Sequence, residues 1–245
     1  MDRAIYTAMS AANAALNRQS ITSNNLANSS TTGFRAQLAA FRSVPVEGQT
    51  HATRALVAET TPFHDNTMGP VNHTGRSLDV ALPQDGWLAV AAPDGSEGYT
   101  RNGGIQVDSE GALSVNGFPV MGDGAPIVVP PQSSLTIAPD GTITALGAGD
   151  EPTAVVPVGR LKMVNASMQE MVHGDEGLFH PAGGAALPAD QDMQLSPEAL
   201  EGSNVSPVKA MAEMIANARG FEMNMKVVRT ADENAKQANQ LLSLG

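Results

Sequence analysis

Residues 206–244 read SPVKAMAEMIANARGFEMNMKVVRTADENAKQANQLLSL, and this stretch decides the architecture of the chain. Ser206 is a favourable helix N-cap, Pro207 suits the first helical position, and no proline follows. A helix of about 38 residues is about 57 Å long, longer than a small domain is wide, so its apolar face needs a partner helix. That face repeats at steps of three and four, through Met211, Met214, Ala218, Phe221, Met225, Val228, Ala235 and Leu242.

A second amphipathic helix is predicted for residues 4–28. A run of serine and threonine that ends in Gly33 stops it, since glycine tolerates positive φ. Asn24, Asn25 and Asn28 allow two interpretations: hydrogen bonds that satisfy the helix end, or amide pairs that fix the register of a helix–helix interface. The apolar positions share the period of the C-terminal helix, and they include Ile5, Met9, Ala12, Leu16 and Leu26.

The part of the chain between the helices is predicted to be β structure. Short apolar runs alternate there with Asp-Gly and Asn-Gly pairs, which are strong hairpin signals. The pairs are Asp85-Gly86, Asp94-Gly95, Asn102-Gly103, Asn116-Gly117, Asp123-Gly124 and Asp140-Gly141. The predicted fold class is therefore α+β: long N- and C-terminal helices paired as a coiled coil, with an inserted antiparallel β domain that is a sandwich or barrel-like.

This pattern divides the chain into five segments. Residues 43–75 show no sustained period and read as an extended connector with one hairpin at most. The expected segments are an N-terminal helix of an axial helical domain (1–33), the extended connector (34–76), the antiparallel β domain (77–180), a return loop (181–202) and the C-terminal helix of the axial helical domain (203–245).

Charge and composition exclude several classes of protein. The net charge is −11; residues 1–42 carry +3 and residues 203–245 carry +1, which leaves −15 for the middle. No basic patch points to nucleic acid. The chain has no cysteine, no run of 18 apolar residues for membrane insertion, and an N-terminus that does not resemble a cleaved signal peptide.

The sequence contains no recognisable catalytic or metal-binding pattern. Five histidines lack zinc-ligand spacing, and the Gly-Asp pairs do not form a calcium loop. No nucleophile elbow, phosphate-binding loop or dinucleotide fingerprint is present. The adjacent carboxylates at Asp150-Glu151 and Asp175-Glu176 are expected on a solvated surface. We therefore expect no enzyme activity, no cofactor, no metal and no small-molecule substrate.

Several motifs resemble the bacterial flagellar rod and hook proteins. Residues 21–35, ITSNNLANSSTTGFR, are similar to the N-terminal signature of that family, and residues 200–205, LEGSNV, with 214–226, MIANARGFEMNMK, to its C-terminal signature. LDVA at 78–81, YTRNG at 99–103 and GAPI at 124–127 match its β domain in order. Trp87, Asn102 and Gly220 depart from the usual family residues. The short start, MDRAIYTAM, most resembles the proximal rod members.

The resemblance implies a structural subunit of the flagellar basal body. Relatives are exported through the flagellar type III apparatus without a cleaved signal, and polymerise with copies of themselves and neighbouring rod proteins into a hollow drive shaft that crosses the periplasm and transmits torque. Phe34 and Leu38 resemble an export-gate element, although packing at the helix exit is an alternative role for Phe34. The expected assembly interface comprises Ile5, Met9, Ala12, Leu16, Asn24, Asn25, Leu26, Asn28, Asn204, Met211, Met214, Ala218, Phe221, Met225, Val228 and Leu242.

Two other functions fit the same pattern. Within the family, a distal rod or hook subunit would share both terminal helices. Outside it, a soluble coiled-coil binding module with a β head would form a closed oligomer, whereas a rod subunit forms open, heterologous contacts. In dilute solution, terminal helices that lack partners are expected to be frayed, and assembly would order them.

Overall fold

The computed structural model describes residues 2–45, 55–59, 63–147, 149, 151 and 154–243. The chain forms two compact units. The helical unit comprises Met1–Ser29, Ala36–Asp65 and Val205–Gly245, and the β unit comprises Ser30–Arg35 and Asn66–Asn204. One long helix lies near each terminus and many short strands form separate sheets, which confirms the predicted α+β class.

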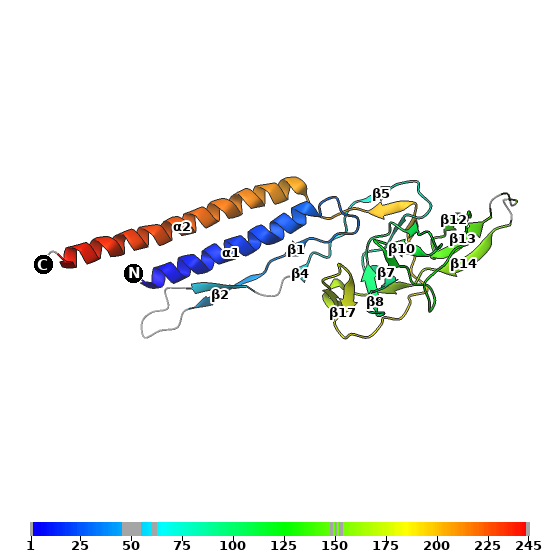
Figure 1. The fold of residues 1–245 in the computed structure, drawn as a ribbon, viewed down its shortest axis with the longest axis horizontal. Coiled ribbons are helices and arrows are strands. Elements are labelled where there is room, and N and C mark those ends of the chain that lie inside the picture. The colour runs from blue at the N-terminus through cyan, green and yellow to red at the C-terminus, as the bar shows by residue number, and fades with distance from the viewer. Residues whose placement is uncertain are drawn as a thin grey trace. The chain divides into compact units, whose positions relative to one another are not determined.

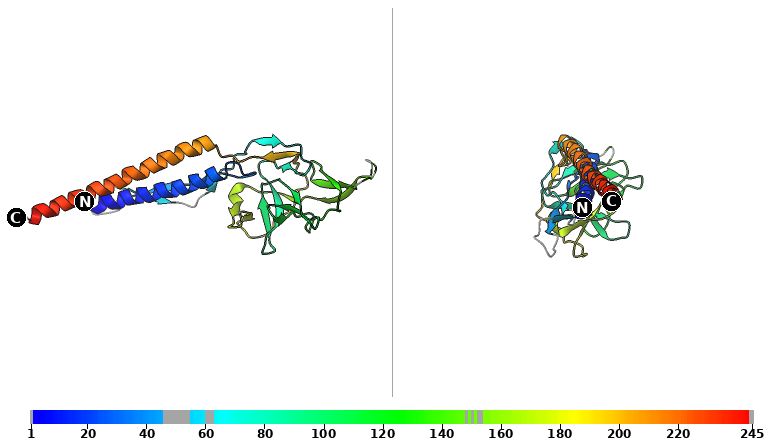
Figure 2. Two further views of the ribbon diagram at one scale, coloured as in Figure 1. Left: turned by 45° about the horizontal axis from the view of Figure 1, so that its top comes forward. Right: turned by 90° about the vertical axis from the view of Figure 1, so that its left-hand side faces the viewer.

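Two long helices dominate the helical unit. They are α1 (Asp2–Ala27) and α2 (Pro207–Ser243), and α2 begins at the proline that favours a first helical position. The two helices lie side by side and run in opposite directions (Figures 1 and 2). In the described part of the chain, neither helix is long and apolar enough to cross a membrane.

Four short strands complete the helical unit. β1 (Gln37–Leu38) pairs with β4 (Phe63–His64), and β2 (Phe41–Pro45) pairs with β3 (Ala55–Glu59), all antiparallel. The predicted connector therefore contains a β hairpin, and β3 packs against α1. Residues 46–54 and 60–62 of that connector lie outside the described residues.

Fifteen antiparallel strands make up the β unit among the described residues. The largest sheet has five strands in the order β15-β7-β8-β17-β16, and the others have two or three. The strands are β5 (Val71–His73), β6 (Val80–Ala81), β7 (Gly86–Ala91), β8 (Glu97–Thr100), β9 (Gln106–Val107), β10 (Leu113–Val115), β11 (Phe118–Pro119), β12 (Ser134–Ile137), β13 (Thr142–Leu146), β14 (Val156–Arg160), β15 (Met163–Asn165), β16 (Met171–His173), β17 (Phe179–Pro181), β18 (Ser196–Pro197) and β19 (Ala199–Glu201). A short 3₁₀ turn, Met168–Glu170, precedes β16.

The last two strands lie where a return loop was expected. β18 pairs with β6, and β19 pairs with β5 through Ala199↔His73 and Glu201↔Val71. Three residues are too few for the alternation of β19 to stand out in the sequence. The segment that leads to α2 is thus tied to the start of the β unit.

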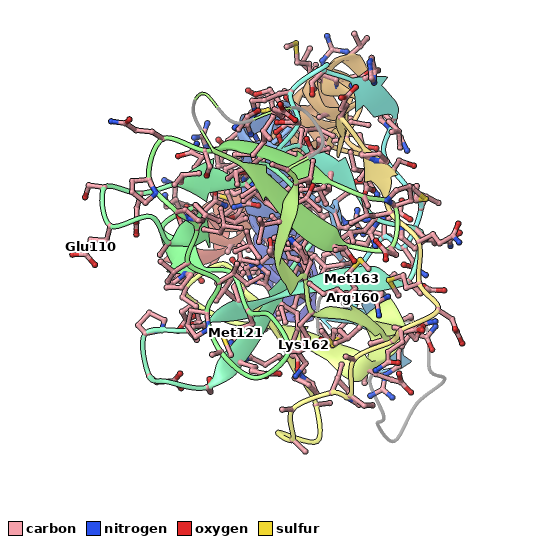
Figure 3. All side chains as sticks on the ribbon, turned by 90° about the vertical axis from the view of Figure 1, so that its right-hand side faces the viewer. Glu110, Met121, Arg160, Lys162 and Met163 are labelled. Carbon is pink, nitrogen blue, oxygen red and sulfur yellow. The ribbon has the colours of Figure 1, made fainter. Side chains whose placement is uncertain are left out.

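The β unit has two apolar clusters. The larger joins strands of four sheets and includes Leu88, Leu113, Ile137, Ile143 and Leu161. The smaller surrounds Trp87, which is 1% exposed, lies 4.8 Å from the Phe179 ring, and donates Nε1–H to the Ala166 carbonyl at 2.9 Å. At the surface of the unit, the side chain of Glu110 points outward, and Met121 lies near Lys162, whose N–H donates to the Met121 carbonyl at 2.9 Å (Figure 3).

Two of the four predicted Asp-Gly turns have an aspartate side chain that stabilises them. Asp94 accepts hydrogen bonds from the Ser96 hydroxyl and N–H, and Asp140 accepts them from Thr142. These bonds favour the ionised carboxylates and lower the pKa of both aspartates. The hairpins predicted at Asp85-Gly86 and Asn102-Gly103 are wrong. β6 pairs with β18 and not with β7, and β8 pairs with β7 and β17 while β9 pairs with β10.

Gly103 is required there for a close approach of two backbones. Its carbonyl accepts the Val80 N–H at 3.1 Å, and a Cβ at this position would lie 1.7 Å from the Val80 carbonyl oxygen. Both atoms near the clash belong to main chain inside a packed unit, so neither has room to move.

We expect Gly103→Ala to lower the free energy of unfolding of the β unit by at least about 3 kcal/mol, because the clash forces the backbone apart. Urea unfolding followed by the fluorescence of Trp87, the single tryptophan, measures the change. Gly183→Ala is the matched control, since a Cβ there meets nothing within 4 Å. Equal midpoints for the two variants would contradict the close-approach role.

Candidate assembly interface

The covered face of α1 consists largely of small residues. Its buried side chains recur at steps of four, three and seven: Ala8, Ala12, Ala15 and Thr22. α2 packs on this face, where Asn217 contacts Thr22, whereas β3 contacts α1 at Ser10 and β1 contacts it at Asn25, which lie on other sides of the helix. Alanine side chains occupy little space between helix axes, and they therefore permit close approach of the backbones.

The covered face of α2 follows the same period. The less exposed positions recur at steps of three and four, and they include Ala210, Met214, Asn217, Phe221, Asn224, Val228, Ala231, Ala235 and Ala238. A polar contact joins the two faces, where Asn217 Nδ2 donates to Thr22 Oγ1 at 3.5 Å. The intramolecular helix pair is thus built mainly from small or polar residues, with a few larger ones.

Large apolar side chains face the solvent instead. On α1, Tyr6, Met9 and Leu16 are 48–62% exposed, and on α2 the exposed fractions run from 50% to 79% for Val208, Met211, Ile215, Met223 and Val227. At 100° per residue, Val208, Ile215 and Met223 lie on the side opposite Ala210 and Phe221, and Met211 and Val227 lie at its flanks. An exposed set of large apolar side chains on this scale is typical of a surface that binds another protein.

The predicted interface residues divide between the covered and exposed faces. Buried or half-buried positions are Ile5, Ala12, Asn25, Leu26, Asn28, Asn204, Met214, Phe221, Met225 and Val228. Exposed positions are Met9, Leu16, Asn24, Met211 and Ala218. Leu242 lies in the last turn of α2, beyond the part of the helix whose side chains are described.

The asparagines near the end of α1 make local hydrogen bonds. Asn25 exchanges two bonds with the Gln37 main chain, both at 2.8 Å, and so ties β1 to the helix. Asn28 donates from Nδ2 to the Asn24 carbonyl at 3.0 Å. The bond of Asn28 agrees with hydrogen bonding that satisfies the helix end, whereas Asn25 binds strand β1, which neither interpretation had predicted.

The β2–β3 hairpin forms one wall of a groove along α1. The Ser10 hydroxyl bonds both the N–H and the carbonyl of Val57 at 3.1 Å, and the Arg18 guanidinium lies 4.3 Å from the Phe41 ring centre. The groove holds about 420 Å³ and is lined by Tyr6, Met9, Ser10, Asn13, Ala14, Asn17, Phe41, Leu56 and Val57. None of these lining residues is charged, so a partner buried there would desolvate no ion.

Phe34 and Leu38 fall in different units. Phe34 is half-buried in the β unit, and its carbonyl accepts the Asn204 N–H at 3.3 Å. Leu38 is 38% exposed in β1 and pairs with Phe63 of β4. The half-burial of Phe34 agrees with packing at the helix exit.

A buried ion cluster lies within the β unit. Glu201 forms an ion pair with Arg35, whose Nη2 lies 2.9 Å from Oε1, and accepts hydrogen bonds at Oε2 from Arg101 Nε and Nη2 at 2.9 and 2.5 Å. The three side chains are 0–1% exposed. The Gly69 N–H donates to Oε1 of Glu201, the oxygen beside Arg35, at 3.0 Å. Both Arg101 nitrogens donate to one oxygen, Oε2, and these charge-assisted hydrogen bonds are stronger than bonds between neutral groups.

Main-chain carbonyls accept hydrogen bonds from the Nη1 atoms of both guanidinium groups. Arg101 Nη1 donates to the carbonyls of Pro83, Gln84 and Gly86 at 2.6–2.8 Å. Arg35 Nη1 donates to the carbonyls of Asn66 and Thr67. One carboxylate therefore lies between two cations that carbonyl dipoles also stabilise.

The sequence analysis did not single out this cluster. Each of its residues belongs to a motif that carries the family resemblance: Arg35 ends TTGFR, Arg101 lies in YTRNG, and Glu201 lies in LEGSNV. A charged residue within two positions of a glycine in each motif was the available signal. That the three meet in space follows only from the fold.

The titratable groups elsewhere in the β unit do not form a metal site. Burial lowers the pKa of His173. The pKa of Glu176 is lowered by a hydrogen bond from the backbone N–H of Glu176 itself and by the bond to His180. Among the residues that the structure describes, no group of three or more histidines, aspartates or glutamates is placed to hold a metal ion.

Comparison with known protein families covers both units. Residues 5–35 match the model described as flagella basal body rod protein, and residues 196–241 match the C-terminal model of the flagellar basal body rod FlgEFG proteins. Residues 81–145 match the D1 domain of the flagellar hook protein FlgE/F/G. The three matches follow the order of the motifs in the sequence.

Similar proteins extend over the whole chain. The flagellar basal-body rod protein FlgF of Salmonella typhimurium is 57% identical, and that of Escherichia coli is 55% identical, each over 100% of both chains. The rod protein FlgG of Buchnera aphidicola is 30% identical over 90% of this chain and 92% of its own. The chain therefore belongs to the family of flagellar basal-body rod proteins, within its FlgF group, and is a structural rod subunit rather than an enzyme.

Proposed function

We propose that the chain is a subunit of the proximal rod, and that it polymerises through the outward faces of α1 and α2. In this proposal the helices pair as an antiparallel coiled coil, pack against those of neighbouring subunits, and form a hollow shaft that crosses the periplasm and transmits torque. The observation that carries the proposal is the exposure of eight large apolar side chains on the two helices.

Energetics supports an interface on these faces. Burial of one large apolar side chain contributes about 1.5–3 kcal/mol, whereas the alanines of the covered faces contribute much less. Neighbouring helices would therefore add more apolar burial than the intramolecular pair provides. Close packing of such helices also resists bending, which a drive shaft requires.

The charge distribution is compatible with this arrangement. The helical unit carries nine basic and eight acidic residues, whereas the β unit carries five basic and seventeen acidic residues. Nearly neutral helices can pack closely without strong repulsion, and acidic β units favour separation from one another.

Export through the flagellar type III apparatus belongs to the same proposal. The Phe34 and Leu38 pair is a candidate export-gate element, and Leu38 is exposed in the folded chain. Because Phe34 is half-buried, the pair would be presented together by an unfolded chain. In the proposed rod, contacts between copies of the chain and with neighbouring rod proteins involve the exposed residues of the predicted interface, which are Met9, Leu16, Asn24, Met211 and Ala218.

Two alternatives differ in their neighbours. A distal rod or hook subunit would pack through the same helices against other members of the family. A soluble coiled-coil binding module would instead form a closed oligomer of fixed size. The family resemblance and the matches over the whole chain favour a rod subunit over the soluble module.

We expect Ile215→Asp to abolish incorporation into the rod and motility, because the 57% exposed side chain lies on the outward face of α2. A carboxylate buried against a neighbouring helix loses several kcal/mol, while in the monomer it stays in water. Swimming assays and recovery of the chain in purified basal bodies measure the effect. Ile215→Met keeps the apolar contact, and Ser133→Asp adds the same charge in the β unit. Normal motility of Ile215→Asp would refute the interface.

We expect Met223→Cys to form cross-links with rod proteins and with further copies of the chain in isolated basal bodies. The chain has no cysteine, so a thiol-specific photo-cross-linker attaches only at the introduced residue, which replaces a 66% exposed side chain. Ser133→Cys, in the β unit, is the comparison site. Cross-links to hook subunits would favour the distal alternative. A closed oligomer of one size in dilute solution would favour the soluble module.

A further inference from the structure

We propose that the Arg35–Glu201–Arg101 cluster closes the β unit, so that fraying of the terminal helices stops at this point. The inference rests on the proposed assembly, in which neighbouring subunits order the helices. It assigns a role to three residues outside the helices: they keep the β unit intact whether or not α1 and α2 are packed.

The position of the cluster along the chain is the first argument. The chain passes between the two units four times, at Ser29–Ser30, Arg35–Ala36, Asp65–Asn66 and Asn204–Val205. We call residues 30–35, 66–69 and 201–204 the junction segments, since they are the β-unit sides of these passages. Each passage is a place where disorder in the helical unit could enter the β unit.

The second argument is that the junction segments have little regular structure. Residues 30–35 and 66–69 form neither helix nor strand, and of residues 201–204 only Glu201 lies in a strand. No ladder of hydrogen bonds therefore holds the first two segments to a sheet. Their order depends on individual contacts.

Those contacts converge on Glu201 and its neighbours. The Glu201 carboxylate binds Arg35 and the Gly69 N–H, while its carbonyl accepts the Gly33 N–H at 2.8 Å. Asn204 extends the set, because its Nδ2 donates to the Thr67 carbonyl at 2.9 Å. All three junction segments are thus bound to one another through a single strand end.

Arg101 fixes this assembly of segments to the core. Its guanidinium binds Glu201 and three carbonyls at the start of β7. Its backbone packs against Gly33, where a Cβ would lie 2.5 Å from the Arg101 carbonyl carbon. Gly33 has φ +70°, which glycine adopts without strain. The fit at Gly33 therefore aligns the first junction segment with the cluster.

Full burial makes the cluster cooperative. Loss of the Glu201 carboxylate would leave two buried guanidinium groups without a counter-ion in a low-dielectric site, so an opening that separates both pairs is strongly disfavoured. Closure of the whole boundary therefore depends on Glu201, which holds both arginines. The terminal helices can consequently order on assembly without a rearrangement of the β unit.

Limited proteolysis of the full chain, with mass spectrometry of the fragments, tests the boundary. We expect the wild-type fragment to retain residues 30–35 and 201–204. In Glu201→Gln it should shorten to about residues 70–198, because the neutral amide no longer binds both arginines. Arg35→Met keeps the Arg101–Glu201 pair, so it should release residues 30–35 and 66–69 while β19 stays protected. Glu97→Gln breaks the Lys162–Glu97 pair at 2.7 Å in the same unit and should retain the wild-type fragment.

Hydrogen exchange of the same proteins supplies a readout that does not depend on trimming. Exchange in peptides that cover the first two junction segments should rise at least about tenfold in Arg35→Met and stay unchanged in Glu97→Gln. Unchanged exchange and fragment ends in both cluster variants would overturn the inference. If wild-type helices proved as protected as the β unit, the proposed ordering on assembly would fail, and the exchange comparison would still decide the role of the cluster.

Discussion

Small side chains between the two terminal helices are the constraint on which the rest of this structure depends. Ala8, Ala12 and Ala15 on α1 lie in the covered face, while Met9, Leu16 and Ile215 face water. A buried methyl group contributes about 0.8 kcal/mol and a buried leucine-sized side chain about 1.5–3 kcal/mol. The helical unit thus leaves many of its large apolar side chains outside, although Met214, Phe221 and Val228 lie on the covered face. Such a unit gains most of its possible burial from other molecules, which is the property that a polymerising subunit needs.

The two units of the chain divide the physical requirements of an assembly between them. The helical unit is nearly neutral and offers apolar surface, so attraction there is short-ranged and depends on close fit. The β unit carries an excess of twelve acidic residues, and its repulsion acts over the roughly 8 Å that physiological salt allows. Random association through the β unit is thereby disfavoured. In the proposed assembly, subunits therefore associate specifically through their helices.

Periodicity in the sequence was sufficient to predict both helices, and Asp-Gly pairs were sufficient for hairpin turns such as those at Asp94 and Asp140. The choice of face was harder, because Met211 and Met214 both fit a repeat of three and four, yet only Met214 lies on the covered side. The sequence pattern alone does not show which apolar stripe of α2 packs against α1 and which remains exposed. The prediction at Asn102-Gly103 was wrong for another reason. Glycine is needed there because the backbone passes close to Val80, and the same Asn-Gly pair is also typical of a turn. Strands of two or three residues, such as β19, are held by long-range pairing and leave no periodic signal.

The buried cluster also shows why a motif can be informative without revealing its role. A buried ion pair is seldom more stable than well-packed apolar residues, because desolvation offsets most of its Coulomb energy. Its advantage is geometric, since a carboxylate between two guanidinium groups accepts only certain directions of approach. Arg35, Arg101 and Glu201 come from widely separated segments, and each supplies a part that the others cannot replace. An apolar triad of equal volume would tolerate slippage of the junction segments past one another. The charged triad allows a single closed arrangement of the junction segments. The proposed boundary between the β unit and helices that order on assembly requires this fixed geometry more than it requires added stability.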